Sequence, residues 1–248
     1  MQNNSYILIS GATSDIGVEI TNTLASDYAL ILHGRSIDKL VALKEKLKSS
    51  KPVELWSADL SNIEAIKPSL KEFLNSSQLQ VSGFVHCAGL TKILPIKNFR
   101  EDYVREIFNV NLFSAINIIQ ILLMKNNISS LNRIIFISSL VSKRGEKGNT
   151  IYASSKGAID GLVKSLAMEL APNINVNSIL PAIVKTKMTE NILNDSEIIS
   201  KLNAKYPIGY GQGRDIALMV QFLLGEGGRW ITAQNYHVDG GASMAYLA

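Results

Sequence analysis

Short apolar runs alternate with amphipathic stretches along the whole of this 248-residue chain. Continuous apolar runs of this kind are typical of buried strands. We expect strands at residues 6–9, 29–33, 53–56, 83–86, 133–137, 175–180 and 235–238. Between them, apolar residues recur at the spacing of a helix face. We expect helices at 16–24, 37–48, 63–74, 100–125, 152–170 and 215–224, and a more polar helix near 188–203.

This alternation of strand and helix predicts an α/β fold, because buried parallel strands need crossover helices on both faces of the sheet. The expected architecture is a doubly wound, Rossmann-type three-layer sandwich with a mostly parallel seven-stranded sheet. No internal repeat, low-complexity tract or break in composition marks a second domain, so residues 1–248 are expected to form a single domain.

The composition is that of a globular protein and favours neither nucleic acid nor a membrane as a partner. Hydrophobic residues make up 46% and charged residues 19%, as in globular proteins. The net charge of +4 is small and scattered, which does not indicate nucleic acid as a partner. The single cysteine, Cys87, the absence of a signal-like start and the absence of a long apolar run predict a cytoplasmic protein without a membrane partner. The three histidines lack metal-ligand spacing, so no metal site is expected.

The turn after the first strand carries small residues suited to phosphate. Doubly wound sheets bind ligands outside the carboxyl ends of their strands, and residues 10–17 read SGATSDIG at such an end. Gly11 permits a tight turn, and the N–H groups of the following helix can bind a pyrophosphate. An ordinary strand-to-helix turn has the same ingredients, but the position after the first strand favours a dinucleotide. We expect Asp15 to cap the helix with its carboxylate turned away from the phosphates.

The end of the second strand indicates which dinucleotide is bound. An acidic residue there would accept from the ribose 2′-hydroxyl, whereas an arginine suits a 2′-phosphate. The chain has no acid at this point and places Arg35 and Ser36 there. The expected cofactor is therefore NADP, with NAD less favoured. A surface arginine that follows a strand is the alternative interpretation.

Candidate acid–base residues lie between positions 134 and 156. Ser139 follows an apolar strand, and Tyr152 and Lys156 are four residues apart, which places them on one face of a helix. A phenol, an ammonium and a serine hydroxyl form a plausible acid–base site. Alone, such a pair is commonly a solvated helix face and such a serine a turn residue. The nucleotide-binding turn favours the catalytic interpretation.

Taken together, these segments resemble the short-chain dehydrogenase/reductase (SDR) superfamily in its single-domain branch, over essentially the whole chain. Within it, the chain looks most like 3-oxoacyl-acyl-carrier-protein reductases and their relatives. The matching segments are SGATSDIG (TGxxxGxG), Asp59, Cys87-Ala88-Gly89 (the end of NNAG), Asn111, Ser139, Tyr152 with Lys156, Pro181-Ala182 with Thr186, and ITAQNYHVDGG (TGQxxxVDGG). The departures are Ser10, Asp15, His86, Cys87 and Ala182, which touch the expected cofactor groove rather than the acid–base groups.

The resemblance implies an oxidoreductase that transfers a hydride between nicotinamide and a carbonyl or secondary alcohol. Tyr152 would be the general acid or base. Lys156 and the positively charged ring of the oxidised nicotinamide would together lower the pKa of the phenol, and Lys156 would also bind the nicotinamide ribose. Ser139 would hold the substrate oxygen, and Asn111 would hold a water that links Lys156 to solvent. Ser138 is expected to be structural, as are His33 and His237, whereas His86 is expected to line the cofactor groove.

The cofactor is expected to bind mainly to the first half of the chain, about residues 1–130, and catalysis and substrate binding to the second, about 131–248. The expected cofactor-binding residues are Gly11, Thr13, Ser14, Asp15, Ile16, Gly17, Arg35, Ser36, Asp59, Leu60, Cys87, Ala88, Gly89, Tyr152, Lys156, Pro181, Ala182, Val184 and Thr186.

The substrate pocket is expected from three segments, 90–96, 140–146 and 183–202, with a lid within about 183–212. Basic residues in these segments suggest an anionic or carrier-linked substrate, such as a 3-oxoacyl thioester or a nucleotide-linked sugar, although solvated loop charges would look the same. They are Lys92, Lys143, Arg144, Lys185 and Lys187.

The resemblance also implies association into a homotetramer or homodimer through the long helices and the C-terminal strand and tail. Two alternatives to an oxidoreductase remain. One is a catalytically lapsed nucleotide-binding or scaffold protein of the same fold, which the retention of all four catalytic residues disfavours. The other is a lyase or epimerase, whose relatives tend to be longer than this chain.

Overall fold

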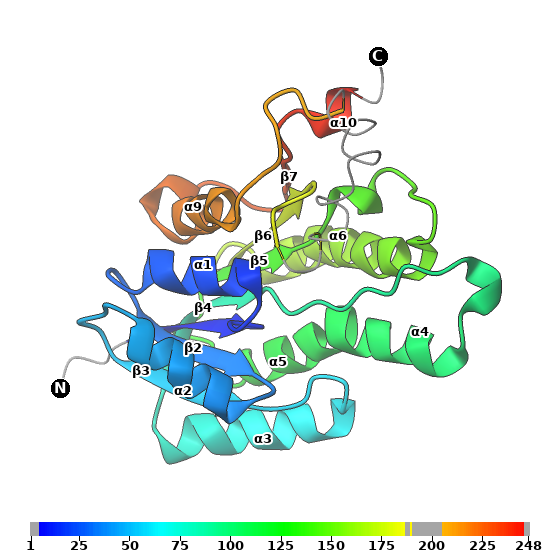
Figure 1. The fold of residues 1–248 in the computed structure, drawn as a ribbon. Helices are drawn as coiled ribbons and strands as arrows, with labels where there is room; N and C mark the ends of the chain where they lie inside the picture. Colours follow the sequence, from blue (N-terminus) through cyan, green and yellow to red (C-terminus); the bar gives the residue numbers. More distant parts are fainter. Residues whose placement is uncertain (1–4, 187–188, 190–204, 246–248) are drawn as a thin grey trace.

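The computed structural model describes residues 5–186, 189 and 205–245, and these form a three-layer α/β sandwich (Figure 1). Its sheet has seven strands in the order β3-β2-β1-β4-β5-β6-β7, and every neighbouring pair is parallel. The predicted fold class is therefore confirmed. The strands are β1 (Ser5–Ser10), β2 (Ala29–Gly34), β3 (Val53–Ser57), β4 (Gln80–His86), β5 (Arg133–Ile137), β6 (Asn175–Pro181) and β7 (Asn235–Val238).

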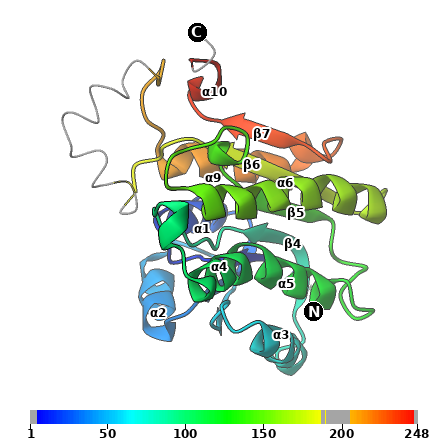
Figure 2. The same ribbon diagram turned by 90° about the vertical axis from the view of Figure 1, so that its right-hand side faces the viewer.

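Helices cover both faces of the sheet, as parallel strands require. They are α1 (Asp15–Leu24), α2 (Ile37–Lys46), α3 (Ile63–Ser76), α4 (Glu101–Phe108), α5 (Ser114–Leu122), α6 (Thr150–Leu170), α9 (Gly213–Leu224) and α10 (Ala242–Ala245), with short helical turns η1 (Ile96–Asn98), η2 (Asn109–Phe113), η3 (Leu140–Ser142) and η4 (Glu226–Gly228). Figure 1 shows α1 and α9 above the sheet and α3 and α5 below it. Figure 2 shows β7 and α10 at the opposite end of the molecule from α2 and α3.

Two apolar cores lie on either side of the sheet and explain why its strands are apolar throughout. In β1, Leu8 packs into the core under α3, α5 and α6, whereas Ile7 and Ile9 pack into the core under α1, α2 and α9. Successive side chains of a strand point to opposite faces, so a strand covered on both sides needs an apolar residue at every position. All three side chains are at most 3% exposed.

The helix expected at 100–125 is interrupted. Between α4 and α5, η2 is a π-helical turn, and its central residue Asn111 is completely buried. A π turn inserts one residue into a helix and is frequent at functional sites. The apolar spacing continues through it, which is why the sequence alone predicts one helix. Apart from residue 189, the helix expected near 188–203 lies outside the described residues, as does the end of the C-terminal tail.

The position of the cleft follows from the strand order, which reverses between β1 and β4. A doubly wound sheet opens a crevice at this switch point, at the carboxyl ends of the strands. The turns after β1, β4 and β5 therefore meet at one edge of the sheet. Within the part of the chain described, no helix combines the length and the apolar content needed to cross a membrane.

Candidate active site

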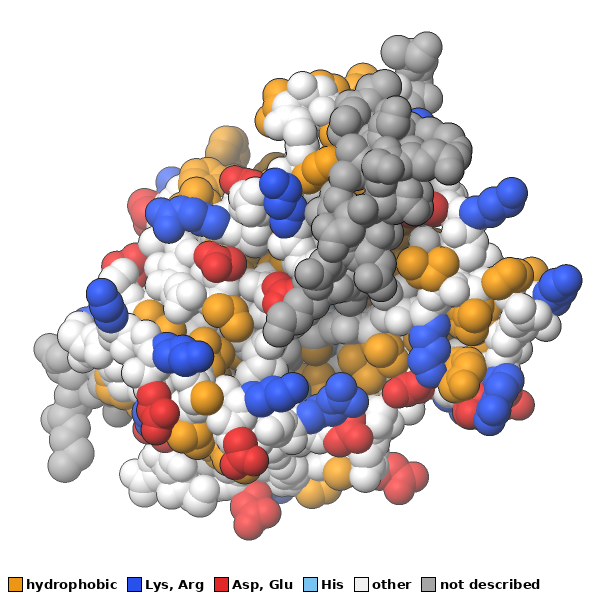
Figure 3. Space-filling model, in the orientation of Figure 1, with side chains coloured by type: hydrophobic (Ala, Val, Ile, Leu, Met, Phe, Trp, Pro, Cys, Tyr) orange, Lys and Arg blue, Asp and Glu red, His pale blue; other side chains and the backbone are white. Residues whose placement is uncertain are grey.

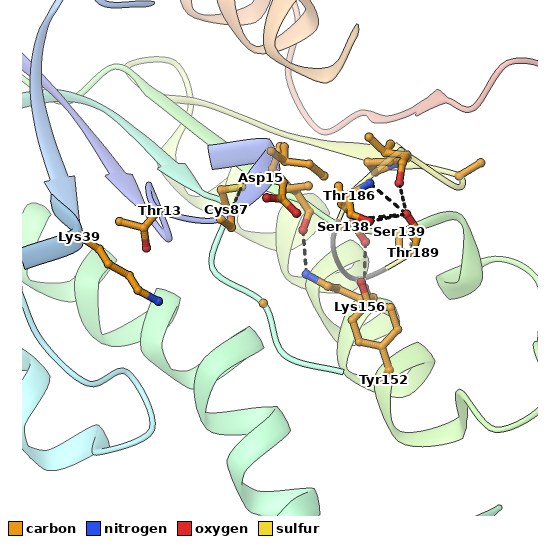
Figure 4. Close-up of a pocket in the computed structure, with 17 residues that line it drawn as sticks. Thr13, Asp15, Lys39, Cys87, Ser138, Ser139, Tyr152, Lys156, Thr186 and Thr189 are labelled. Carbon is orange, nitrogen blue, oxygen red and sulfur yellow. Dashed lines mark hydrogen bonds between the residues drawn. The ribbon is translucent and has the colours of Figure 1, made fainter. Parts of the chain in front are cut away.

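A cavity of about 350 Å³ lies along the carboxyl ends of the strands, between the start of α1 and the start of α6 (Figure 4). Of the residues expected at the site, it brings together Thr13, Ser14, Asp15, Ile16, Cys87, Gly89, Ser139, Tyr152, Lys156, Pro181, Ala182, Val184 and Thr186. The lining also includes Lys39, Ile137, Ser138 and Thr189, which the sequence did not single out as site residues. The chemical candidates from distant parts of the chain thus share one cavity.

The turn at one end of the cavity is built on Ser14 and Gly11. Ser14 has an extended backbone, and its Oγ accepts from the N–H of Gly17 at 3.1 Å and donates to the carbonyl of Gly11 at 2.8 Å. Ser14 is therefore the N-cap of α1, and the prediction that Asp15 caps the helix is wrong. Asp15 is the first helical residue, and its side chain lines the cavity (Figure 4).

Two glycines allow this turn to pack closely. Gly11 has φ of +69°, and a Cβ there would lie 2.7 Å from the backbone of Ala88 after β4. A Cβ at Gly17 would overlap with the carbonyl oxygen of Gly11. Neither glycine lines the cavity, so their role is to shape the turn rather than to offer a side chain.

A buried histidine supports the turn from below. The N–H of Gly11 donates to Nδ1 of His33 at 3.3 Å, and Nε2 of His33 donates to the carbonyl of Ala58 at 3.1 Å. Burial lowers the pKa of His33 to about 4, so its ring is neutral at physiological pH. This arrangement agrees with the structural role expected for His33.

His86 also has a structural environment, and the prediction that it lines the cofactor groove is wrong. Its ring is completely buried, and burial lowers its pKa to about 3. Nε2 donates to the carbonyl of Asn111 at 3.1 Å, so Nδ1 accepts from the hydroxyl of Ser10 at 2.8 Å. Ser10 and His86, two of the departures from the family motifs, are therefore bonded to each other.

Asn111 holds the segment that follows β4. Its Oδ1 accepts from the N–H of Leu90 at 2.7 Å, and its Nδ2 donates to the carbonyl of Leu90 at 3.0 Å and to Ser155 Oγ at 2.9 Å. Both amide hydrogens are thus used within the protein. A water bound to Asn111 could therefore only donate to one of its oxygens. The expected water relay stays a prediction.

Lys156 is buried at the centre of the cavity wall. Its Nζ donates to the carbonyl of Ile137, the last residue of β5, at 2.8 Å and lies 5.7 Å from the centre of the Tyr152 ring. Burial lowers the pKa of Lys156 to about 8, while electrostatic interactions with Cys87 and Asp160 act in the opposite direction. The ammonium is therefore held in place but is charged only at a considerable cost in desolvation.

Tyr152 lies beside Lys156 on the same face of α6, as the four-residue spacing predicted (Figure 4). Burial raises the pKa of Tyr152 to about 12, and a side-chain hydrogen bond with Ser139 opposes that rise. In the protein without cofactor, desolvation thus outweighs any lowering of the pKa of the phenol, and the expected joint effect of Lys156 and the oxidised nicotinamide stays a prediction. Ser138, by contrast, donates to the backbone carbonyl of Lys156 at 3.4 Å, which fits its expected structural role.

The residues expected around the adenosine lie outside the cavity. Arg35 is exposed, and Ser36 is the N-cap of α2, where its Oγ accepts from the N–H of Lys39 at 3.4 Å. Asp59 accepts from the N–H and the hydroxyl of Ser61, both at 2.9 Å. Ala88 and Leu60 are buried and do not line the cavity.

Lys39 is the residue that sequence reasoning missed at this end. It lines the cavity next to Thr13 and extends from the first turn of α2 (Figure 4). The available signal was its position four residues after Arg35, in the first turn of the helix expected at 37–48.

Two basic residues expected to bind an anionic substrate already have acidic partners. Lys92 forms an ion pair with Glu106 at 3.2 Å, and Lys143 forms one with the buried carboxylate of Asp160 at 3.0 Å. Lys187 lies outside the described residues. On the face shown in Figure 3, basic and acidic side chains are interspersed. Among the described residues, no group of three His, Cys, Asp or Glu is placed to bind a metal ion.

Comparison with known proteins decides the family. Residues 11–243 match the family described as "Enoyl-(Acyl carrier protein) reductase". The chain is 33% identical over 242 residues to 3-oxoacyl-acyl-carrier-protein reductase FabG of Rickettsia bellii (strain RML369-C), with 96% of each chain covered. It is 31% identical over 244 residues to Nodulation protein G of Rhizobium meliloti (strain 1021), again with 96% of each covered. The chain belongs to the SDR superfamily.

A solved structure supports the same conclusion for this SDR protein. The fold matches 4-hydroxyisoleucine dehydrogenase complexed with NADH with a TM-score of 0.89 and 28% identity, covering 97% of this chain and 99% of the other. The predicted resemblance and the enzyme class, an NAD(P)-dependent oxidoreductase acting on CH–OH or C=O groups, are thereby confirmed. The role of each site residue remains a prediction that the geometry supports.

Proposed function

We propose that this SDR enzyme uses NADP(H) to interconvert a carbonyl group and a secondary alcohol, with Tyr152 as general acid and base. The observation that carries the proposal is the shared cavity: Tyr152, Lys156 and Ser139 line the same space as the first turn of α1. The N–H groups of a first helical turn have no partner within the helix and can bind phosphate. Gly11 and Gly17 leave room for the turn that presents them.

The cofactor supplies the hydride, and this chain supplies the binding site and the proton. The start of α1 would bind the pyrophosphate. Pro181, Ala182 and Thr186 would contact the nicotinamide end, because they line the cavity beside Lys156. The carboxylate of Asp15 lies in the same lining and would repel a phosphate, so we propose that it faces away from the diphosphate in the complex.

In reduction, Tyr152 would give its proton to the carbonyl oxygen. The phenol, with a pKa near 12, is fully protonated at neutral pH and so is ready as an acid. The hydroxyl of Ser139, which is bonded to Tyr152, would help to hold the same oxygen. Lys156 would stabilise the phenolate that forms, since its ammonium is the nearest fixed cation on the helix.

Two cations support NADP over NAD. Arg35 follows β2 and Lys39 extends into the cavity, and neither is accompanied by an acid at the strand end. NAD remains the alternative, because the 28% identical 4-hydroxyisoleucine dehydrogenase was solved with NADH.

For the substrate, we propose a small ketone or a 3-oxoacyl thioester. The curated relatives support the thioester, since FabG of Rickettsia bellii is a 3-oxoacyl-acyl-carrier-protein reductase. The pairing of Lys92 with Glu106 and of Lys143 with Asp160 gives less support to recognition of an anionic carrier by these two lysines.

We also propose that the enzyme forms a homotetramer or homodimer in the cytoplasm. Exposed apolar side chains on α9 and just after η4 support association: Leu218, Phe222 and Trp230 are 45%, 48% and 93% exposed. Sedimentation at micromolar concentration should show an oligomer, and a monomer alone would exclude it. The division into a cofactor half and a catalytic half near residue 130 remains part of the proposal, and it falls just before β5.

Fluorescence titration with NADPH and NADH tests the proposed function most directly. Trp56 is buried with its ring 4.6 Å from that of His33, which contacts Gly11, so energy transfer from this tryptophan should report cofactor binding. Turnover is then measured with neutral ketones and 3-oxoacyl thioesters. Binding of neither cofactor would overturn the enzymatic proposal. Binding without turnover on any carbonyl would favour the catalytically lapsed protein instead.

A further inference from the structure

A buried carboxylate lies one helical turn beyond the proposed catalytic lysine. Asp160 follows Lys156 by four residues on α6, and its side chain is 4% exposed. Its Oδ2 accepts from the hydroxyl of Ser142 and forms the ion pair with Lys143. Both partners belong to the segment that leads away from Ser139, so Asp160 joins α6 to that segment.

The hydroxyl of Ser142 lies between two acceptors. Its Oγ is 2.8 Å from the carbonyl oxygen of Ser139 and is also within hydrogen-bond distance of Asp160 Oδ2. A hydroxyl has one proton, and a charged acceptor makes the stronger bond. The proton is therefore directed to Asp160, while the carbonyl of Ser139 accepts the backbone N–H of Ser142 at 3.1 Å.

This anchor bears directly on Ser139. The turn η3 starts at the next residue, and the N–H of Val141 donates to Ser139 Oγ at 3.4 Å. Movement of Ser142 away from α6 would therefore carry Ser139 with it. The same helix carries Tyr152, whose hydroxyl is bonded to Ser139. The relative position of these two groups depends on how η3 is held against α6.

Stability alone gives no reason for a carboxylate at this position. Its neighbours on the buried face, Ile159 and Val163, are apolar and completely buried. The second oxygen of Asp160, Oδ1, is buried without a hydrogen-bond partner among the described residues, which costs free energy. The ion pair offers little compensation, because the Lys143 side chain is 37% exposed and solvent screens the pair. The contacts of Asp160 with Ser142 and Lys143 therefore give a better reason for a carboxylate at this position.

The charges around Asp160 support the same role. Lys143 faces it from the turn, and Lys156 lies one helical turn before it on α6. Cys87 and His86, at the end of β4, interact electrostatically with Lys156. Burial lowers the pKa of Lys156, and Cys87 and Asp160 oppose this. Burial also raises the pKa of Cys87 to about 11, so its thiol stays protonated near pH 8, where Lys156 titrates.

We propose that Asp160 is a positioning residue that holds the turn after Ser139 against the helix that carries Tyr152 and Lys156. The inference rests on the proposed function, because the alignment matters only if these groups act on a substrate. It assigns Asp160 no contact with the substrate or the cofactor.

Three variants test this role. Asp160→Asn removes the charge but keeps an acceptor for Ser142, Ser142→Ala removes the anchor and keeps the charge, and Glu169→Gln is the matched control, an exposed carboxylate on the same helix. We expect Asp160→Asn to lower kcat at least tenfold, with the KM for cofactor within twofold. The alkaline limb of its kcat/KM profile should move to lower pH. Ser142→Ala should lower kcat without moving that limb, and Glu169→Gln should change neither.

Two further measurements separate the outcomes. Thermal unfolding identifies a purely structural role, in which Asp160→Asn lowers the Tm but leaves kcat and the pH profile as in the wild type; that result overturns the proposal. If the wild type turns over no carbonyl compound, the proposed function fails, and amide hydrogen exchange over residues 139–146 still tests the anchor. Faster exchange in Asp160→Asn and Ser142→Ala supports the anchor, and unchanged exchange refutes it. If Asp160→Asn does not fold, Ser142→Ala and Lys143→Met replace it as tests of the anchor. Their kcat and their hydrogen exchange over residues 139–146 are then the two measurements.

Discussion

The ammonium of Lys156 donates a 2.8 Å hydrogen bond to the carbonyl of Ile137, which joins the second turn of α6 to the end of β5. Ser139 follows this strand end by two residues. A single buried cation thus links the helix and the strand that carry the proposed acid–base groups. Because this bond needs only one of the three ammonium hydrogens, the other two remain for the cofactor or for Tyr152.

The first prediction concerns the pH dependence of reduction. The pKa of Lys156 is lowered to about 8, so its charge is present below that pH and is lost above it. Tyr152, near 12, stays protonated throughout this range. The kcat/KM for cofactor, which reports the free enzyme, should be constant up to about pH 8 and then fall with rising pH. Initial rates between pH 6 and 10 provide the measurement; a profile that stays flat to pH 10 would contradict the assignment.

The second prediction concerns the phenol itself. Tyr152→Phe removes one hydroxyl from the cavity lining and keeps the ring, so cofactor affinity should change by less than about twofold. Loss of general acid catalysis typically costs 10²–10⁴-fold, and we expect kcat to fall by about 10³-fold. Tyr28→Phe is the control. Tyr28 lies just before β2, at the amino ends of the strands and away from the cavity, so this variant should retain wild-type turnover. Retained activity in Tyr152→Phe would mean that another group donates the proton.

Much of the fold could be predicted because it depends on local patterns. All seven strands lie where apolar runs predicted them, with ends that differ by at most a few residues. Tyr152 and Lys156 share a face because a four-residue spacing on a helix leaves no other arrangement. The π turn at Asn111 was missed because one inserted residue barely disturbs the apolar spacing.

The roles that were predicted wrongly or missed are determined by the three-dimensional structure rather than by local sequence patterns. Ser14 and Asp15 are both good capping residues, and only the backbone conformation shows that Ser14 takes this position. The environment of His86 depends on Ser10, 76 residues away. Likewise, the role of Lys39 depends on where α2 lies relative to the cavity, which sequence spacing does not fix.

The third prediction concerns acid stability. His33 and His86 have folded-state pKa values of about 4 and about 3, below the ordinary 6.5, so the unfolded chain binds more protons and stability is lost as pH falls below about 6.5. At pH 5 each histidine should cost about 2 kcal/mol relative to neutral pH. Urea unfolding at pH 7 and pH 5 measures the loss. The loss of unfolding free energy between pH 7 and pH 5 should be about 2 kcal/mol smaller in His33→Gln than in the wild type. It should be the same as in the wild type in His237→Gln, which alters an exposed histidine. An equal loss in all three proteins would show that other groups control acid unfolding.

The fourth prediction concerns the choice of cofactor. If Arg35 and Lys39 bind the 2′-phosphate, then Arg35→Ala and Lys39→Ala should each raise the Kd for NADPH by about tenfold, which corresponds to about 1.4 kcal/mol for one charge-assisted contact. The Kd for NADH, which lacks that phosphate, should stay within about twofold. Lys46→Ala, at the other end of α2, is the matched control and should bind both cofactors as the wild type does. Fluorescence titrations at low salt, where exposed charges are least screened, give these values. An equal loss of affinity for NADPH and NADH would assign the two cations to a part that both cofactors share, and tighter binding of NADH by the wild type would make NAD the physiological cofactor.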